Sequence, residues 1–184
     1  MSELGVALQE WAGICELLGS GALLLTVRKG GIHERGGGLF ALEHQRFWLL
    51  PTFVHQDGSR LRPGIPLPHD PEPGWHRLQL WAEAAGLWRV TERALLDRLE
   101  LPWTETELSA RFHYRQQPWL FVIALRVHRL PQPARIPDHP SYGGCRSWIR
   151  LQQPQSCAGS APVLPDAAFA ARLAEYRRIL GDPA

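Results

Sequence analysis

The sequence predicts an α+β fold with a mixed or antiparallel curled sheet and flanking helices. Apolar residues recur at helical spacing near both ends of the chain, and the continuous or alternating apolar runs typical of strands lie between them. The strongest run, residues 119–130, carries large apolar side chains on both faces, so we expect it at the centre of the sheet. Strands broken by proline also suit a small curled barrel.

The first expected element is a helix over residues 4–18. Apolar side chains recur there at spacings of four and three, and the glycines that follow end the pattern. The apolar run 22–28 predicts a buried strand. The run 47–50, closed by Pro51, is either a strand or the end of a short helix, because its period does not distinguish the two.

Strands are expected next over 78–83 and 87–90, paired across a turn at 84–86. Two short helices follow. Thr91 can cap the first, and Thr104 begins the capping-box spacing of the second. The order of strands and helices supports the α+β class.

The C-terminal part begins with the central strand 119–130 and continues with a final strand over 145–151. Asp166 is expected to cap the last helix, and Gly181 to end it. We expect residues 1–184 to form a single domain. Two proline-rich stretches, 56–74 and 131–142, are expected as loops.

Composition narrows the classes of function. The net charge of +2 is too small to indicate nucleic-acid or membrane binding by itself. The three cysteines form no C-x-x-C pair, so we expect no disulfide framework, no zinc site and no cofactor. The N-terminus lacks the pattern of a signal peptide, and the apolar runs are too short to span a membrane. These features predict a cytoplasmic location.

Lys29 is the only lysine among twenty basic residues. Its ammonium is more compact than a guanidinium, and its pKa can fall on burial, so it can act as a base or nucleophile. The segment 28–56 around it is the densest in polar side chains, and its glycines leave N–H groups that can point at an anion. The residues expected to bind a phosphate or carboxylate are Arg28, Lys29, Gly30, Gly31, His44, Arg46 and His55.

The same segment suits a nuclease-like hydrolase that uses Lys29, Glu43 and His44, because these side chains supply acid and base groups. A metal-dependent nuclease would carry a carboxylate two residues before the lysine, but position 27 is valine. The histidines form no H-E-x-x-H pattern, so no metal site is expected. The sequence leaves open whether the protein is an enzyme.

Three further features have alternative interpretations. Cys145 follows two glycines and precedes an arginine, so it is either a thiol of lowered pKa or a buried strand residue. Trp81 falls on the polar side of its strand, which suits either an exposed ring that stacks on bases or packing under a helix. The proline-rich loops could instead bind a protein partner, since arginine and tryptophan are common at interfaces.

A set of short motifs resembles a known family. They are Trp11-Ala12, Leu23-Leu24-Leu25, Arg28-Lys29-Gly30-Gly31-Ile32, Glu43-His44, Leu50-Pro51-Thr52, His55-Gln56 and Cys145-Arg146-Ser147-Trp148-Ile149. The sequence is similar in these motifs to the bacterial domain of unknown function 1802 family. The resemblance covers most of the chain and implies that the 28–56 segment and the turn at Cys145 are family features. It implies no particular activity, because the family has none assigned.

The opening of the chain also resembles that of PUA- and ASCH-like barrels, which bind RNA or modified bases. The similarity lies in a helix, a glycine link and a strand that ends in a basic residue. Together these features predict a cytoplasmic protein that binds an anionic ligand, with nucleic acid or a nucleotide as the first class. A protein partner remains the alternative.

Overall fold

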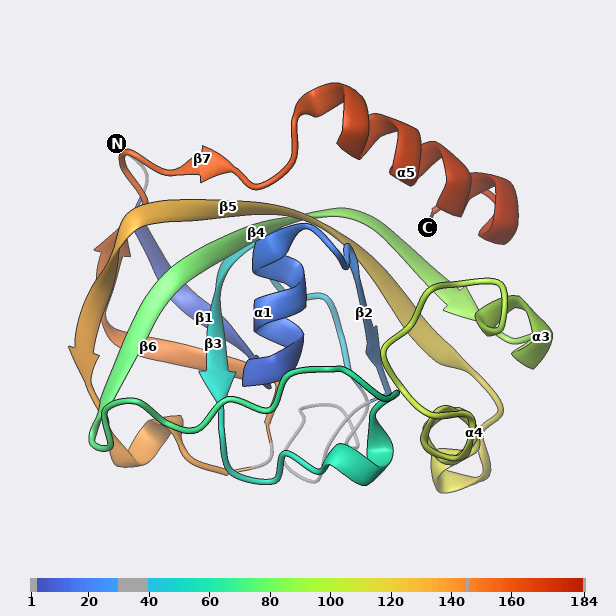
Figure 1. The fold of residues 1–184 in the computed structure, drawn as a ribbon, viewed down its shortest axis with the longest axis horizontal. Coiled ribbons are helices and arrows are strands. Elements are labelled where there is room, and N and C mark those ends of the chain that lie inside the picture. The colour runs from blue at the N-terminus through green and yellow to red at the C-terminus, as the bar shows by residue number, and fades with distance from the viewer. Residues whose placement is uncertain (1–2, 30–39, 145, 184) are drawn as a thin grey trace.

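The computed structural model describes residues 3–29, 40–144 and 146–183, and it contains one mixed sheet of seven strands (Figure 1). The strand order is β2-β5-β4-β3-β1-β6, and β7 pairs with β5. β1 and β3 are parallel, and all other pairs are antiparallel. The predicted α+β class with a mixed sheet is therefore confirmed. The strands are β1 Glu3–Trp11, β2 Leu25–Arg28, β3 Arg46–Thr52, β4 Trp75–Val90, β5 Leu120–Pro137, β6 Trp148–Ser156 and β7 Ala161–Pro162.

Helices cover the inside of the curled sheet and one of its outer sides (Figure 1). The helix α1 connects β1 to β2, α3 and α4 follow β4, and α5 lies near the C-terminus. None of the described helices is long and apolar enough to cross a membrane. Their bounds are α1 Ala12–Ser20, α3 Arg93–Leu96, α4 Glu105–Phe112 and α5 Asp166–Leu180, with short 3₁₀ turns at Gly58–Arg60, Tyr114–Gln116 and Pro140–Tyr142.

The predicted helix caps are correct in part. Thr104 caps α4 as expected, because its hydroxyl accepts a hydrogen bond from the Glu107 N–H. Thr91 does not cap α3, which begins at Arg93 without a side-chain cap. Asp166 does not cap α5, because Pro165 holds the N-cap position and no side chain caps the helix; instead the Asp166 carboxylate pairs with Arg126 of β5 and attaches the start of α5 to the sheet.

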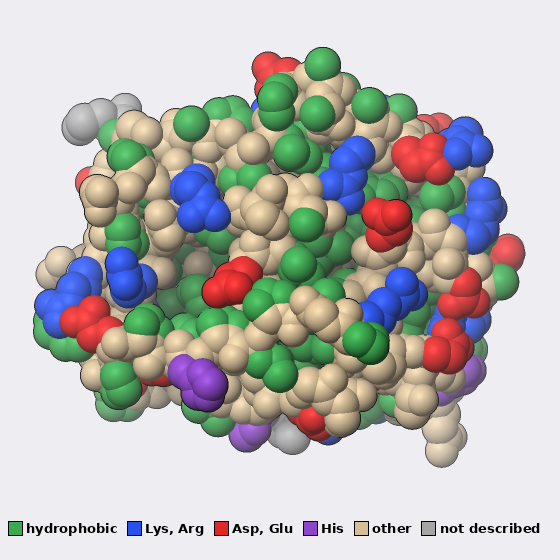
Figure 2. Space-filling view, viewed as in Figure 1, with side chains coloured by type: hydrophobic (Ala, Val, Ile, Leu, Met, Phe, Trp, Pro, Cys, Tyr) green, Lys and Arg blue, Asp and Glu red, His purple; other side chains and the backbone are tan. Residues whose placement is uncertain are grey.

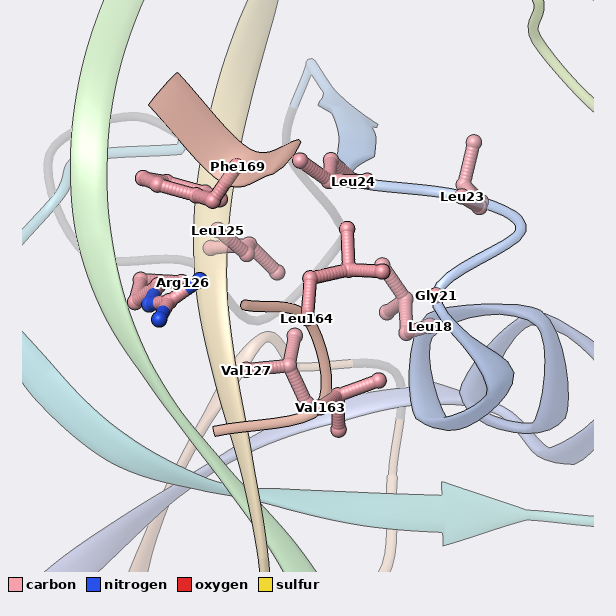
Figure 3. A pocket seen from close by; sticks show the side chains of 10 residues that line it. All are labelled: Leu18, Gly21, Leu23, Leu24, Leu125, Arg126, Val127, Val163, Leu164 and Phe169. Atoms are coloured by element: carbon pink, nitrogen blue, oxygen red, sulfur yellow. The ribbon is translucent and has the colours of Figure 1, made fainter. Parts of the chain in front are cut away.

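The packing between α5, α1 and β5 is close (Figure 3). Leu18 of α1, Leu125 of β5 and Phe169 of α5 surround a space of only about 10 Å³, which is too small to hold a ligand. The guanidinium of Arg126 lies 4.7 Å from the Phe169 ring centre. This region therefore attaches α5 to the sheet and contains no binding pocket.

The expected N-terminal helix over 4–18 is wrong in its first half. Residues Glu3–Trp11 form β1, and the helix begins only at Ala12. β1 lies between β3 and β6 and is buried on both faces, with Leu8 in one apolar core and Ala7 in the other. Strand pairing on both sides therefore outweighs the helical spacing of its apolar residues.

The expected hairpin at 84–86 is also wrong, because β4 continues without a turn to Val90. Its pairing with β5 shifts register between Ala84 and Gly86, so an irregularity takes the place of a turn. The Trp88 ring lies over Gly86, where a Cβ atom would be 2.4 Å from the ring. The glycine is thus needed for close packing within a strand.

Of the two proline-rich stretches, 131–142 is a loop only at its end. Residues 131–137 continue β5, and Ile136 pairs with His76 at the start of β4. The stretch 56–74 contains only a 3₁₀ turn and one isolated bridge. It packs on the start of α1, where the Gly13 N–H donates to the Gln56 side chain at 2.9 Å.

Trp81, expected as an exposed stacking ring, is buried at 5% exposure. Its ring stacks on His128 with centres 4.0 Å apart, and its indole N–H donates to the Ser160 hydroxyl at 2.8 Å. A register shift between Leu78 and Leu80 places Trp81 in the second core, so both faces of β4 are covered. The polar neighbours of Trp81 in the sequence therefore do not indicate exposure.

Glu10, near the end of β1, joins two sides of the curled sheet that no strand ladder connects in the described residues. Its buried carboxylate accepts hydrogen bonds from the Thr26 hydroxyl at 2.7 Å and from Arg28 at 2.8 Å, both on β2. Arg28 also donates to the Gln9 carbonyl at 2.7 Å. β6 pairs with β1 only as far as Leu8, so beyond that residue Arg28 takes the position of a neighbouring strand.

We expect Glu10→Gln to lower the free energy of unfolding by about 3 kcal/mol, because it leaves the Arg28 guanidinium buried without its counter-charge. Arg28→Met should cost a similar amount by leaving the carboxylate unpaired. The double variant should cost at least about 1 kcal/mol less than the sum of the two, since the groups act on each other. Urea denaturation of the four proteins measures this coupling, and strictly additive costs would contradict the proposed bridge.

Candidate functional site around Lys29

The sole lysine lies directly after β2 and is buried, with 6% of its surface exposed. Its ammonium donates hydrogen bonds to three backbone carbonyls, those of Phe112, Gln117 and Trp119, of which the bond to Phe112 is 3.2 Å long. An ammonium has three hydrogens, so each has an acceptor within the protein. Three converging carbonyls suit a compact ammonium better than a planar guanidinium, which explains the choice of lysine at this position.

The Trp119 ring connects Lys29 to a second cation. The Lys29 Nζ atom lies 4.0 Å from the ring centre, and the Arg89 guanidinium lies 4.7 Å from it. Burial and, to a smaller extent, the nearby charge of Arg89 together lower the pKa of Lys29 to about 8. Lys29 therefore remains protonated at neutral pH.

The three carbonyls belong to residues at or just beyond the two ends of an exposed loop, residues 113–117, which we call the recognition loop. It contains two consecutive non-glycine residues in the left-handed region, Arg115 at φ 58° and Gln116 at φ 57°. Such residues carry strain that the surrounding structure must maintain. Because Lys29 binds Phe112 before the loop and Gln117 at its end, it holds both ends of this strained segment.

The recognition loop presents side chains that differ in chemistry. The Tyr114 ring is 39% exposed, and the Arg115 guanidinium lies 5.5 Å from its centre. His113 and the two glutamines are exposed as well. The exposed guanidinium of Arg89 packs on the ring of Trp119, whose backbone carbonyl binds Lys29. An aromatic ring, a cation and amides thus lie together on the loop, and Arg89 lies against Trp119, two residues beyond its end.

The residues predicted from segment 28–56 do not all meet. Arg28 pairs with Glu10 inside the curl, and its buried Nε atom has no hydrogen-bond partner among the described residues. Arg46 pairs with Glu83 at 3.2 Å and lies over Trp81, on the face of β3 opposite Phe47. Arg46 therefore belongs to a different side of the sheet from the Lys29 region.

The remaining predicted residues are dispersed too. The His44 ring contacts Trp148 edge-on at 5.1 Å, and Glu43 beside it is exposed. His55 is exposed in the loop after β3, with φ at 73°. Gly30, Gly31 and Cys145 lie outside the described residues. Among those described, no contact joins the Lys29 ammonium to Glu43 or His44, and no three His, Cys, Asp or Glu residues are placed to hold a metal ion.

Little in the sequence indicates the recognition loop. The run His113 to Gln117 is polar and stands between a capped helix and Pro118, which favours a loop. Nothing in that run shows that a lysine more than eighty residues earlier binds its ends. The sequence pattern places Arg89 in one expected strand and Trp119 at the start of another, and it does not indicate that the two side chains pack together.

The pH dependence of stability tests the burial of Lys29. Its pKa in the folded protein, about 8, lies below the usual lysine value of 10.5, so as pH rises the folded state releases its proton first. The contribution of Lys29 to the free energy of unfolding should therefore grow as pH rises from about 8 towards 10.5. Chemical denaturation of the wild type and of Lys29→Met should show a larger difference at about pH 9.5 than at about pH 7. An equal difference at both would contradict a lowered pKa.

Comparisons with known proteins give a family and distant structural relatives. Two crystal structures of ZmASCH from Zymomonas mobilis, a serine-to-alanine and a tyrosine-to-phenylalanine variant, match with TM-scores of 0.44 and 0.46. Each is 14% identical, and the matches cover 92% of this chain and 94% and 96% of the other chains. A search of curated proteins finds no match. The model of one family, Domain of unknown function (DUF1802), matches residues 7–175, which is most of the sequence. The chain therefore belongs to the DUF1802 family.

Proposed function

We propose that the protein binds single-stranded nucleic acid with the recognition loop and Arg89, and that Lys29 positions this surface without contacting the ligand. The observation that carries the proposal is a strained, exposed loop held at both ends by a buried ammonium. Residues in strained backbone conformations cluster at ligand sites, and binding residues often lie on loops that a rigid scaffold positions.

The side chains of this surface suit the parts of a nucleotide chain. Arginine binds phosphate through paired N–H groups, which Arg89 and Arg115 can supply. An exposed ring such as that of Tyr114 can stack on a base, and such stacking tolerates any base. The amide of Gln116 can offer donors and an acceptor to base edges, whereas the amide oxygen of Gln117 already accepts from the Trp119 indole N–H at 3.2 Å and leaves its N–H groups as donors. A single strand fits best, because its bases are available for stacking.

Because the net charge of the molecule is small, binding of nucleic acid has to depend on a local surface. Acidic and basic side chains are interspersed on the face shown in Figure 2, in line with the small net charge of +2. A broad electrostatic attraction to nucleic acid is therefore weak. Affinity then has to come from a few specific contacts, and its dependence on salt should be modest.

This proposal changes the role expected for Lys29 and Arg28. The hydrogens of Lys29 are engaged by carbonyls, and Arg28 donates to Glu10 and Gln9. Using either as a phosphate contact would require breaking these buried bonds, which costs free energy. We therefore assign them to positioning and to the fold, and assign the anion contacts to Arg89 and Arg115.

Substitutions in the recognition loop should weaken binding to a fluorescein-labelled oligouridine, measured by fluorescence anisotropy. Tyr114→Ala should lower affinity by about tenfold, because it removes a stacking ring. Arg115→Ala should weaken binding and reduce the slope of log affinity against log salt by about 0.7, the value for one phosphate of a single strand. Arg150→Ala, an exposed arginine on β6, is the matched control and should change nothing. No binding by the wild type, or equal affinities for all four proteins, would refute the proposal.

A further inference from the structure

A groove of about 390 Å³ lies at the end of β4, near Arg89. It is lined by residues 88–90 of β4, by Glu92 and Leu95 around the start of α3, and by Leu180 and Asp182 at the end of α5. Figure 1 shows β4 leading into α3, with the C-terminus on the same side of the view. The volume lies in the range of pockets that hold a ligand or a few residues of a partner.

The groove runs along an open strand edge. β3 pairs with β4 only over residues 81–83, and the Ala84 N–H bonds to the Gln45 carbonyl. From residue 85 to Val90, β5 is the only strand paired with β4 within the described parts of the chain. Three successive residues of β4 line the groove and no residue of β5 does, so the groove lies on the edge facing away from β5. Such an edge offers unpaired backbone N–H and C=O groups.

The walls of the groove are fixed by packing. The Trp88 indole N–H donates to the Gly181 carbonyl at 2.8 Å, which ties the end of α5 to β4. The same ring covers Gly86, where no larger side chain fits. Binding to a preformed groove costs less conformational entropy than binding to a groove whose walls must first become ordered. The edge is therefore ready to receive an added strand.

The lining also indicates the chemistry of the occupant. Val90, Leu95 and Leu180 provide apolar surface, while the carboxylates of Glu92 and Asp182 outnumber the single guanidinium of Arg89. Two carboxylates repel a phosphate backbone and attract basic side chains. A nucleic acid thus fits this groove poorly, and a basic peptide with alternate apolar residues fits it well.

We propose that this groove binds an extended peptide segment of a partner protein, which adds as a strand to the open edge of β4. The backbone of the segment pairs with residues 85–90, as in other cases of strand addition. An apolar side chain of the segment packs between Leu95 and Leu180, and a basic side chain lies near Glu92 and Asp182. Arg89 lines this groove and also belongs to the proposed nucleic-acid surface, so the two sites are adjacent and share this one residue.

The test uses a fluorescein-labelled peptide, acetyl-Lys-Val-Lys-Val-Lys-Val-amide, in anisotropy titrations. The wild type should bind it, and N-methylation of alternate backbone amides should weaken binding by about tenfold, because it removes strand hydrogen bonds. Leu95→Arg, which fills the groove, should weaken binding to a similar degree, whereas Ala170→Arg on the exposed side of α5 should not. Replacing the lysines of the peptide by glutamates should abolish binding. Hydrogen exchange should show protection of residues 85–90 when the peptide is bound.

Three results would overturn the proposal. The first is equal affinity for the methylated and unmethylated peptides, or no binding to either. The second is protection of residues 85–90 that grows with protein concentration without peptide, which would show a second copy of the chain on this edge. The third is displacement of the peptide by oligouridine together with protection of the same amides, which would make the groove part of the nucleic-acid surface. Loss of oligouridine binding in Tyr114→Ala with unchanged peptide binding separates the two sites.

Discussion

The curled shape of the sheet depends on the buried carboxylate of Glu10. β1 and β2 share no ladder in the described residues, yet Thr26 and Arg28 of β2 both bond to this one side chain. The interaction fixes the end of β2 and hence the position of Lys29, the next residue. Lys29 in turn determines where the recognition loop lies, because it binds the carbonyls at its two ends. A chain of buried charges therefore runs from the closure of the sheet to the surface that we propose binds the ligand.

The cations Arg28 and Lys29 have different roles. One terminal nitrogen of Arg28 donates both to the Glu10 carboxylate and to the Gln9 carbonyl on β1. Lys29 faces three carbonyls that converge on one point, which suits a small ammonium. The presence of lysine at position 29 thus has a structural explanation in its compact shape and its three hydrogens.

Much of the fold could be predicted from local patterns, and the failures share a cause. The interior position of β5, between β2 and β4, follows from burial on two faces, although the strand is not at the centre of the sheet as expected, and the capping of α4 by Thr104 follows from a short motif. The strand β1 and the uninterrupted β4 do not, because both are decided by partners distant in sequence. The proposed binding surface cannot be predicted for the same reason. Lys29 stands out in the sequence as the only lysine, but its partners at 112–119 are revealed only when the chain is folded.

The Trp119 ring places two positive charges close together, and this couples ligand binding to protonation. Arg89 lowers the pKa of Lys29, so an anion that neutralises Arg89 would lift that influence and let Lys29 hold its proton more firmly. Near pH 8, binding would then take up a fraction of a proton, and by linkage acidification would strengthen binding. The buried lysine would thus tighten its hold on the recognition loop when the loop is occupied.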